Sequence, residues 1–297
     1  MHGSMDSGLG SADPVVPPLR LKRQRTRFMD VTVAIVLPWL VFFFDVSLFL
    51  FAYHDMKAIV WFLLGACMAL ALLFLTLGAV SRNGTFLAIG FLCFTSVVVG
   101  TAVGLWLQQE YLDRYWELDA GVEYKNVDPT ADARTARNAS IIRFTADTFV
   151  DDRRTIGFVA DGGIFCVAPV TLPMQGDAPV QYWAVGEDCC EKRSNFDCGS
   201  ARELDAATAL VEQPSKVFTA AIEQAKSVYG LNTSTTDAKL VSFVSEAQVV
   251  LNDIWDETLT VALVAMITDL CVCVMSGLVL AKIMTPPAPE QLITQVG

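Results

Sequence analysis

The chain has 297 residues and a formal net charge of −11 at pH 7, and 53% of its residues are hydrophobic while only 18% are charged. Soluble domains carry about 25% charged residues, so this composition excludes an ordinary soluble protein and indicates that part of the chain faces lipid. The segment 108–258 holds 25 acidic and 13 basic residues and therefore carries all of the net negative charge. Such a surface repels phosphate backbones, which argues against nucleic acid as a partner.

Four apolar stretches are each long enough to cross a membrane as a helix, which needs about 20 residues for a hydrocarbon core of about 30 Å. The stretches cover residues 31–52, 58–80, 85–107 and 259–283. Only short links join the first three, so these are expected to form antiparallel hairpins. A soluble protein of this size has too little surface to cover four such helices, and the lipid bilayer is therefore their expected environment.

The basic residues at the ends of these stretches predict the orientation, because cytoplasmic flanks are rich in Lys and Arg. Five bases lie between Arg20 and Arg27, Arg82 lies in the second link, and Lys282 ends the fourth stretch, against Lys57 alone in the opposite link. We expect both termini in the cytoplasm and the first stretch to be an uncleaved signal anchor. The chain is thus expected to be an integral protein of the plasma membrane or an endomembrane.

The predicted fold class is a membrane protein of four transmembrane helices with an α+β, disulfide-linked extracytoplasmic domain between helices 3 and 4. The expected divisions are a mostly disordered basic tail (1–28), membrane helices 1–3 (29–107), the extracytoplasmic domain (108–258), membrane helix 4 (259–283) and a cytoplasmic tail (284–297).

Inside the expected domain, local patterns predict both strands and helices. Alternating apolar residues bounded by turn residues predict strands over 140–145, 155–160, 164–170, 180–185 and 239–244. The sequence Asp161-Gly162-Gly163 is typical of a tight hairpin turn. Apolar residues at helical spacing predict a helix from about Ser215 to Gly230, and helical segments over 108–120 and 246–258 that continue the third and fourth membrane helices.

Four of the eight cysteines lie in this domain: Cys166, Cys189, Cys190 and Cys198. An even number in an oxidising compartment predicts two disulfides. A bond between the adjacent Cys189 and Cys190 would be strained, so Cys166 is expected to pair with one of them and Cys198 with the other. A zinc site usually needs a C-x₂-C pair, which is missing here. The neighbouring acids favour a solvated loop over a weak Ca²⁺ site: Glu187, Asp188, Glu191 and Asp197.

Two acids fall within the apolar stretches, Asp45 in the first and Asp269 in the fourth. A carboxyl group at this depth is costly and by default indicates a proton or ion site. No basic residue lies deep in any stretch, so a buried ion pair is excluded. The interpretation that we favour is hydrogen bonding between helices, with transport as the alternative.

Small residues and glycosylation sequons complete the candidate sites. Gly100-x-x-x-Gly104 in the third stretch, and Gly65 four residues before Ala69 in the second, are spacings that let helices approach closely. Packing inside the bundle is the favoured interpretation, and a homo-oligomer is the alternative. Asn138 and Asn232 begin N-x-S sequons in the domain and are glycosylation candidates. Asn83 begins a third sequon, in a link expected to be cytoplasmic.

Catalytic motifs are missing from the sequence. The two histidines, His2 in the tail and His54 in a short link, exclude His-based triads and the common zinc-protease motif. Phosphate-binding loops, dinucleotide-binding glycine patterns and nucleophile elbows are also missing. We therefore expect a protein that is not an enzyme and uses no cofactor or metal.

Two resemblances can be drawn from these residues. Four spans, internal termini and a large loop with a Cys-Cys pair resemble the topology of tetraspanins, although Glu191 follows the pair where tetraspanins have glycine. A more specific pattern looks like an uncharacterised family of multi-pass membrane proteins from dinoflagellate algae: Phe165-Cys166-Val167-Ala168-Pro169-Val170, Tyr182-Trp183-Ala184-Val185-Gly186-x-Asp188-Cys189-Cys190 and Phe196-x-Cys198. This resemblance implies the same fold and disulfides, and it implies no particular activity.

The expected function is that of a membrane scaffold or surface-recognition protein whose outside domain binds a protein partner. Two alternatives come from other classes. One is a transporter or channel, or an auxiliary subunit of one, that uses Asp45 and Asp269. The other is a lumenal redox enzyme that uses Cys189 and Cys190.

Overall fold

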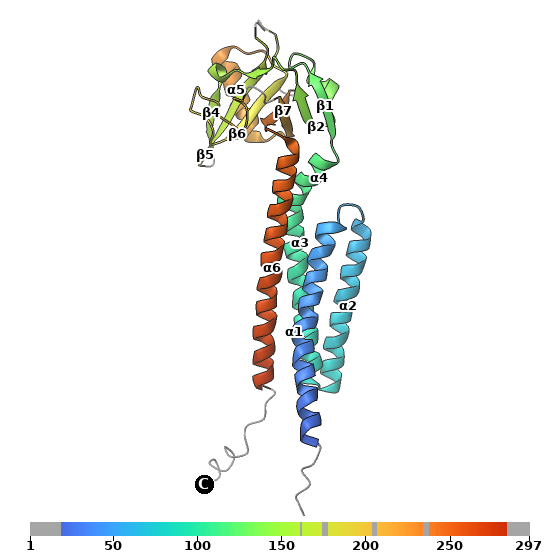
Figure 1. Ribbon diagram of the computed structural model, residues 1–297. Coiled ribbons are helices and arrows are strands. Elements are labelled where there is room, and N and C mark those ends of the chain that lie inside the picture. Colours follow the sequence, from blue (N-terminus) through green and yellow to red (C-terminus); the bar gives the residue numbers. More distant parts are fainter. Residues whose placement is uncertain (1–18, 161, 174–177, 204–206, 234–237, 284–297) are drawn as a thin grey trace, which may run out of the picture. The chain divides into compact units, whose positions relative to one another are not determined.

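The computed structural model describes residues 19–160, 162–173, 178–203, 207–233 and 238–283 (Figure 1). The chain divides into two compact units, residues 1–105 with 263–297, and residues 106–262. The second unit contains the segment 108–258, which the sequence assigns to the extracytoplasmic domain. The ends of both expected tails, 1–18 and 284–297, lie outside the described residues.

The first unit is helical. Its helices are α1 (Leu19–Phe51), α2 (Lys57–Ser81), α3 (Gly84–Leu107) and the C-terminal part of α6 (Ala247–Ile283). Among the described residues, four helices are long and apolar enough to cross a membrane, which suggests an integral membrane protein. Buried residues of three helices pack together: Ala34 from α1, Ala71 from α2, and Ile89 and Cys93 from α3.

Helix α1 includes part of the segment 1–28 that the sequence assigns to the basic N-terminal tail. Helix α1 begins at Leu19, so the part of the tail from 19 to 28 is helical. This segment consists mainly of Leu, Lys, Arg and Gln, which are good helix formers, and it contains neither Gly nor Pro. The helix therefore extends through the basic residues before its apolar part begins.

The second unit is built on a mixed eight-stranded sheet, as far as the described residues show. The strands are β1 (Val122–Val127), β2 (Ala139–Phe144), β3 (Phe149–Val150), β4 (Ile156–Ala160), β5 (Gly163–Thr171), β6 (Tyr182–Glu187), β7 (Thr208–Glu212) and β8 (Lys239–Phe243). Their order is β1-β2-β7-β8-β6-β5-β3, and β4 also pairs with β5. The pairs β1–β2 and β6–β8 are parallel, and the other pairs are antiparallel.

Helical segments complete the second unit. They are the π-helix η1 (Gln108–Leu112), α4 (Asp113–Asp119), the 3₁₀ turns η2 (Ala133–Ala136) and η3 (Asp152–Arg154), α5 (Lys216–Tyr229) and the start of α6. The side chain of Ser215 accepts a hydrogen bond from the backbone N–H of Phe218 at 3.1 Å and caps α5, which ends at Gly230 as expected.

The two faces of the sheet are covered by different parts of the chain. Side chains alternate along a strand, so neighbouring residues on β5 and β6 enter different cores. Val167 and Trp183 pack with α5 on one face, whereas Cys166 and Tyr182 enter the core on the other. That second core also contains Phe196, which belongs to the loop after β6. The cysteine-bearing loop is thus part of the hydrophobic core.

Candidate functional site

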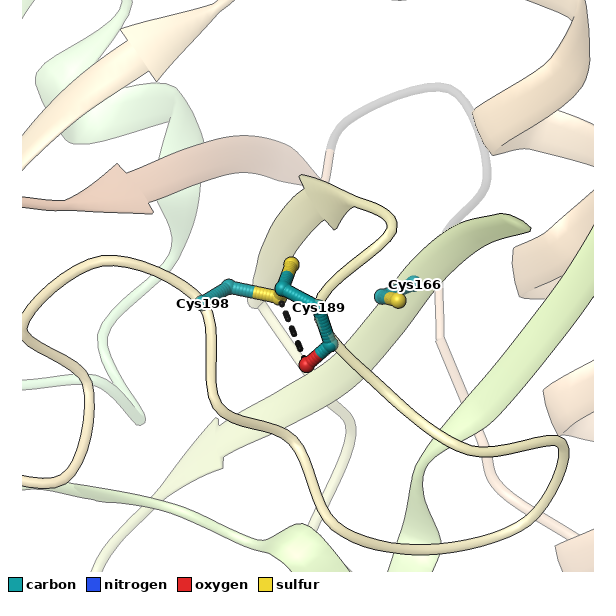
Figure 2. A group of neighbouring side chains, drawn as sticks. All are labelled: Cys166, Cys189 and Cys198. Carbon is teal, nitrogen blue, oxygen red and sulfur yellow. Dashed lines mark hydrogen bonds between the residues drawn. A yellow bond between two sulfur atoms is a disulfide. The ribbon is translucent and has the colours of Figure 1, made fainter. Parts of the chain in front are cut away.

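The four cysteines of the second unit form two disulfides, Cys166–Cys190 and Cys189–Cys198. The expectation of two bonds is confirmed, and the pairing that the sequence left open is decided. Cys166 lies on β5, and Cys189 and Cys190 directly follow β6, its antiparallel neighbour. The sulfur atoms of Cys166, Cys189 and Cys198 lie within 4.8 Å of one another (Figure 2). Disulfide sulfurs are not thiolates, so this cluster is neither a zinc ligand set nor a free dithiol.

Two glycines leave room for the disulfides. A Cβ added at Gly186 would lie 2.6 Å from the sulfur atoms of both Cys189 and Cys198. A Cβ added at Gly157 would lie 3.1 Å from the sulfur of Cys190. These positions accept no side chain without a shift of the sulfurs. The sequence shows that Gly186 lies three residues before Cys189. Only the fold shows that the absence of a side chain at Gly186 leaves space for the disulfide.

The disulfides fix residues 187–200, which we call the display loop. Asp188 pairs with Ile164 on β5: its backbone N–H donates to the Ile164 carbonyl at 2.7 Å, and its carboxylate accepts from the Ile164 N–H at 2.8 Å. The Asp197 N–H donates to the Cys189 carbonyl at 2.8 Å, and the Gly157 N–H donates to the Lys192 carbonyl at 3.1 Å. The loop is therefore held at several points along its length.

Exposed and buried residues alternate in the second half of the display loop. Phe196, Cys198 and Ser200 are buried and anchor it. The exposed residues carry charges of both signs: Glu187, Asp188, Glu191, Lys192, Arg193 and Asp197. Among the described residues, no three acidic side chains bring their oxygens as close together as the three sulfurs.

The two intramembrane acids occupy different environments. Asp45 is fully buried, and neither of its carboxyl oxygens has a hydrogen-bond partner. Asp269 accepts a hydrogen bond from the thiol of Cys273 on its own helix at 3.7 Å. It also lines a cavity of about 410 Å³ together with residues of α1 and α3, among them Phe42 and Ser96. No hydrogen bond joins the two acids among the described residues; the first and fourth helices are instead linked by the indole N–H of Trp39, which donates to the Met266 carbonyl at 3.1 Å.

The glycines of α3 pack against α1. A Cβ added at Gly100 would lie 3.1 Å from the Cβ of Asp45, and one added at Gly104 would overlap the ring of Phe49. Asp45 and Phe49 are one turn apart, so both glycines face the same side of α1. This is packing inside the bundle. At Gly65 an added Cβ would meet nothing within 4 Å in the part of the chain that the structure describes.

Helices α2 and α3 also approach each other closely at two glycines that the sequence did not single out. A Cβ added at Gly90 would lie 2.6 Å from the backbone of Leu75, and one added at Gly78 would overlap the backbone of Leu87. The two glycines stand on either side of the short link at 82–83. Each glycine and the residue that it meets lie at equal distances from the link, as in an antiparallel hairpin of helices.

Both expected glycosylation asparagines lie in the second unit. Asn138 and Asn232 are exposed. The side-chain oxygen of Asn138 accepts a hydrogen bond from the Tyr124 hydroxyl at 2.8 Å. Asn83, in the link between α2 and α3, instead accepts from the Thr85 N–H at 3.1 Å.

The geometry therefore consists of a display loop locked by two disulfides, an unpartnered buried acid and glycine contacts between helices. The resemblances to tetraspanins and to the dinoflagellate family remain hypotheses. No protein-family model, no curated protein and no solved structure matches this chain.

Proposed function

We propose that this chain is a four-span membrane protein with both termini in the cytoplasm, whose second unit recognises a protein partner outside the cytoplasm. The observation that carries the proposal is the display loop, which two disulfides and its buried residues hold in one conformation on the sheet.

A fixed loop is suited to recognition because it loses little conformational entropy when a partner binds. Each disulfide contributes about 2–4 kcal/mol of stability by restricting the unfolded chain. Charges of both signs on the exposed side of the loop provide electrostatic complementarity, which sets specificity and association rate more than affinity. Loops on a rigid scaffold are also where binding residues concentrate.

The test uses the full chain in cells, with crosslinking followed by purification in mild detergent. Lys192 in the display loop and Lys216 at the start of α5 are both exposed. Neither forms an ion pair among the described residues. We expect Lys192→Glu to reduce recovery of the crosslinked partner several-fold, while Lys216→Glu leaves it unchanged. Recovery of the lone chain from wild-type cells, or equal effects of both changes, would contradict the proposal.

A transporter or channel, or an auxiliary subunit of one, is the second candidate. It is favoured by one observation, the fully buried carboxyl group of Asp45 that has no hydrogen-bond partner. Asp45→Asn and Asp269→Asn would then change ion flux or membrane potential in cells. Unchanged readouts in both variants would remove this candidate. A lumenal redox enzyme gains no such observation, because all four cysteines of the second unit are disulfide-bonded.

A further inference from the structure

A groove of about 350 Å³ opens at one end of the sheet of the second unit. The register places the start of β8 beside the end of β7, since Leu240 pairs with Glu212. Strand β2 is antiparallel to β7 and therefore also begins at this end. The rest of the lining includes residues of the turn η2, Arg137 directly after this turn, and Glu117 of α4. Three strands, one turn and one helix thus meet around one opening.

Two cations stand next to each other in this groove. The ammonium group of Lys239 donates a hydrogen bond to the backbone carbonyl of Arg137 at 3.0 Å. Burial, and next the charge of the Arg137 guanidinium, lower the pKa of Lys239 from its ordinary value. Neither side chain forms an ion pair among the described residues. The second unit has almost twice as many acids as bases, so two adjacent uncompensated cations are unusual there.

The two acids of the groove, Glu117 and Glu212, share one cation. Glu212 binds Arg114 at 2.8 Å and accepts a hydrogen bond from Ser242 at 2.7 Å. Glu117 lies 3.6 Å from the same Arg114 and accepts from Gln213 at 3.1 Å. Arg114 balances only one of these two carboxylates, so the groove keeps a small net positive charge, and the cations without an ion pair among the described residues are Arg137 and Lys239.

We propose that this groove binds a small organic anion through a carboxylate, phosphate or sulfate group held by Arg137 and Lys239. Arginine provides a planar fork of donors for such oxygens, and lysine provides a point charge. The volume falls in the range of small-molecule sites and exceeds the needs of a bare inorganic ion. An apolar wall accommodates the body of the ligand: Ala133, Val211, Pro214, Ala238 and Leu240. This binding is independent of the recognition role of the display loop.

The test measures binding of phosphate, sulfate, acetate and benzoate to the full chain in an uncharged detergent, by titration calorimetry at constant ionic strength. We expect saturable binding, with benzoate bound more tightly than acetate because of the apolar wall. Arg137→Gln combined with Lys239→Gln should weaken binding at least tenfold. Arg137→Gln alone keeps the hydrogen bond from Lys239 to the backbone carbonyl of residue 137, so the fold should be preserved. This variant should still weaken anion binding several-fold, which distinguishes a loss of binding from a loss of folding.

The matched control removes two exposed cations outside both the groove and the display loop, with Lys125→Gln and Arg153→Gln, and should bind like the wild type. An absence of saturable binding for all four anions would overturn the proposal. Equal weakening in both double variants would also overturn it, because it would show general attraction by charge. If phosphate and sulfate bind saturably but benzoate does not bind, the proposal of an organic ligand would be overturned. These results leave the test of the display loop unaffected, since that test concerns a different surface.

Discussion

Tyr182 is fully buried on β6, and its hydroxyl has no hydrogen-bond partner. Burial, and to a lesser extent the charge of Asp132, raise its pKa from 10.0 to about 12. The unfolded chain therefore loses this proton at a lower pH than the folded chain. The neutral tyrosine contributes stability that is fully present below about pH 10 and is lost as the pH rises to about 12.

Tyr182→Phe should flatten this alkaline loss of stability. At pH 7 the variant should be as stable as the wild type, or more stable by about 1 kcal/mol, because no hydrogen bond is lost and a buried polar group is removed. The measurement is chemical unfolding of the full chain in detergent between pH 7 and 12, monitored by circular dichroism in the aromatic region. Parallel declines in wild type and variant above pH 10 would show that another group is responsible.

Gly186→Ala should prevent the Cys189–Cys198 disulfide from closing, because the added methyl would lie 2.6 Å from both sulfurs. The expected result is labelling of two cysteines by a membrane-impermeant thiol reagent without prior reduction, with none labelled in the wild type. Gly163→Ala is the control, since its added methyl would come no closer than 3.7 Å to its nearest neighbour. Equal labelling of the two variants would disprove the steric argument.

The cysteines and the intramembrane acids could be predicted as site residues from the sequence, because such residue types are rare in the segments where they occur. An even set of cysteines in an acidic segment predicts disulfides, and an acid in an apolar stretch is exceptional wherever it points. Arg137 and Lys239 carried no such signal. They are 102 positions apart, and the pairing of β7 with both β2 and β8 brings them together.

At the scale of elements, the glycines of the helices have unequal roles. Gly104 packs against the buried ring of Phe49 on α1, whereas Gly65 of α2 has open space around it. Gly104→Ala should therefore lower the stability of the helical unit by about 1–3 kcal/mol through overpacking. Gly65→Ala should be neutral or slightly stabilising, because alanine is the better helix former. Unfolding in mixed micelles measures both, and a larger loss for Gly65→Ala would contradict this assignment.

The strands also show which local sequence patterns are sufficient to predict a strand. The hairpin of β4 and β5 is confirmed, with Ala160 paired to Gly163 and Gly162 at a φ of +88°. Strands β1, β3 and β7 were not predicted. The first is polar and lies at the sheet edge, the second has only two residues, and the third is short and follows an irregular segment. Strands like these form because a neighbouring strand is present, and their own residues give little periodicity.

At the scale of the whole molecule, the orientation predicted from the basic flanks can be tested by glycosylation. In microsomes the full chain should acquire two glycans, and Asn138→Gln and Asn232→Gln should each remove one, as a shift in electrophoretic mobility. Asn83, at the link between α2 and α3, should remain unmodified because it faces the cytoplasm under this orientation. A glycan on Asn83, or proteolysis that places the display loop on the same side as Arg25, would reverse the orientation.

The sequence alone determined the four apolar helices, the division into a helical unit and a sheet-containing unit, and the formation of disulfides. These properties depend on residue type and on spacing within one segment. The tertiary structure alone decided which cysteines pair, that Asp45 has no partner, that α3 packs on α1 through Gly100 and Gly104, and that Arg137 meets Lys239. These properties depend on which side chains come together in the fold, and this follows from strand register, loop path and helix crossing, which no single segment encodes.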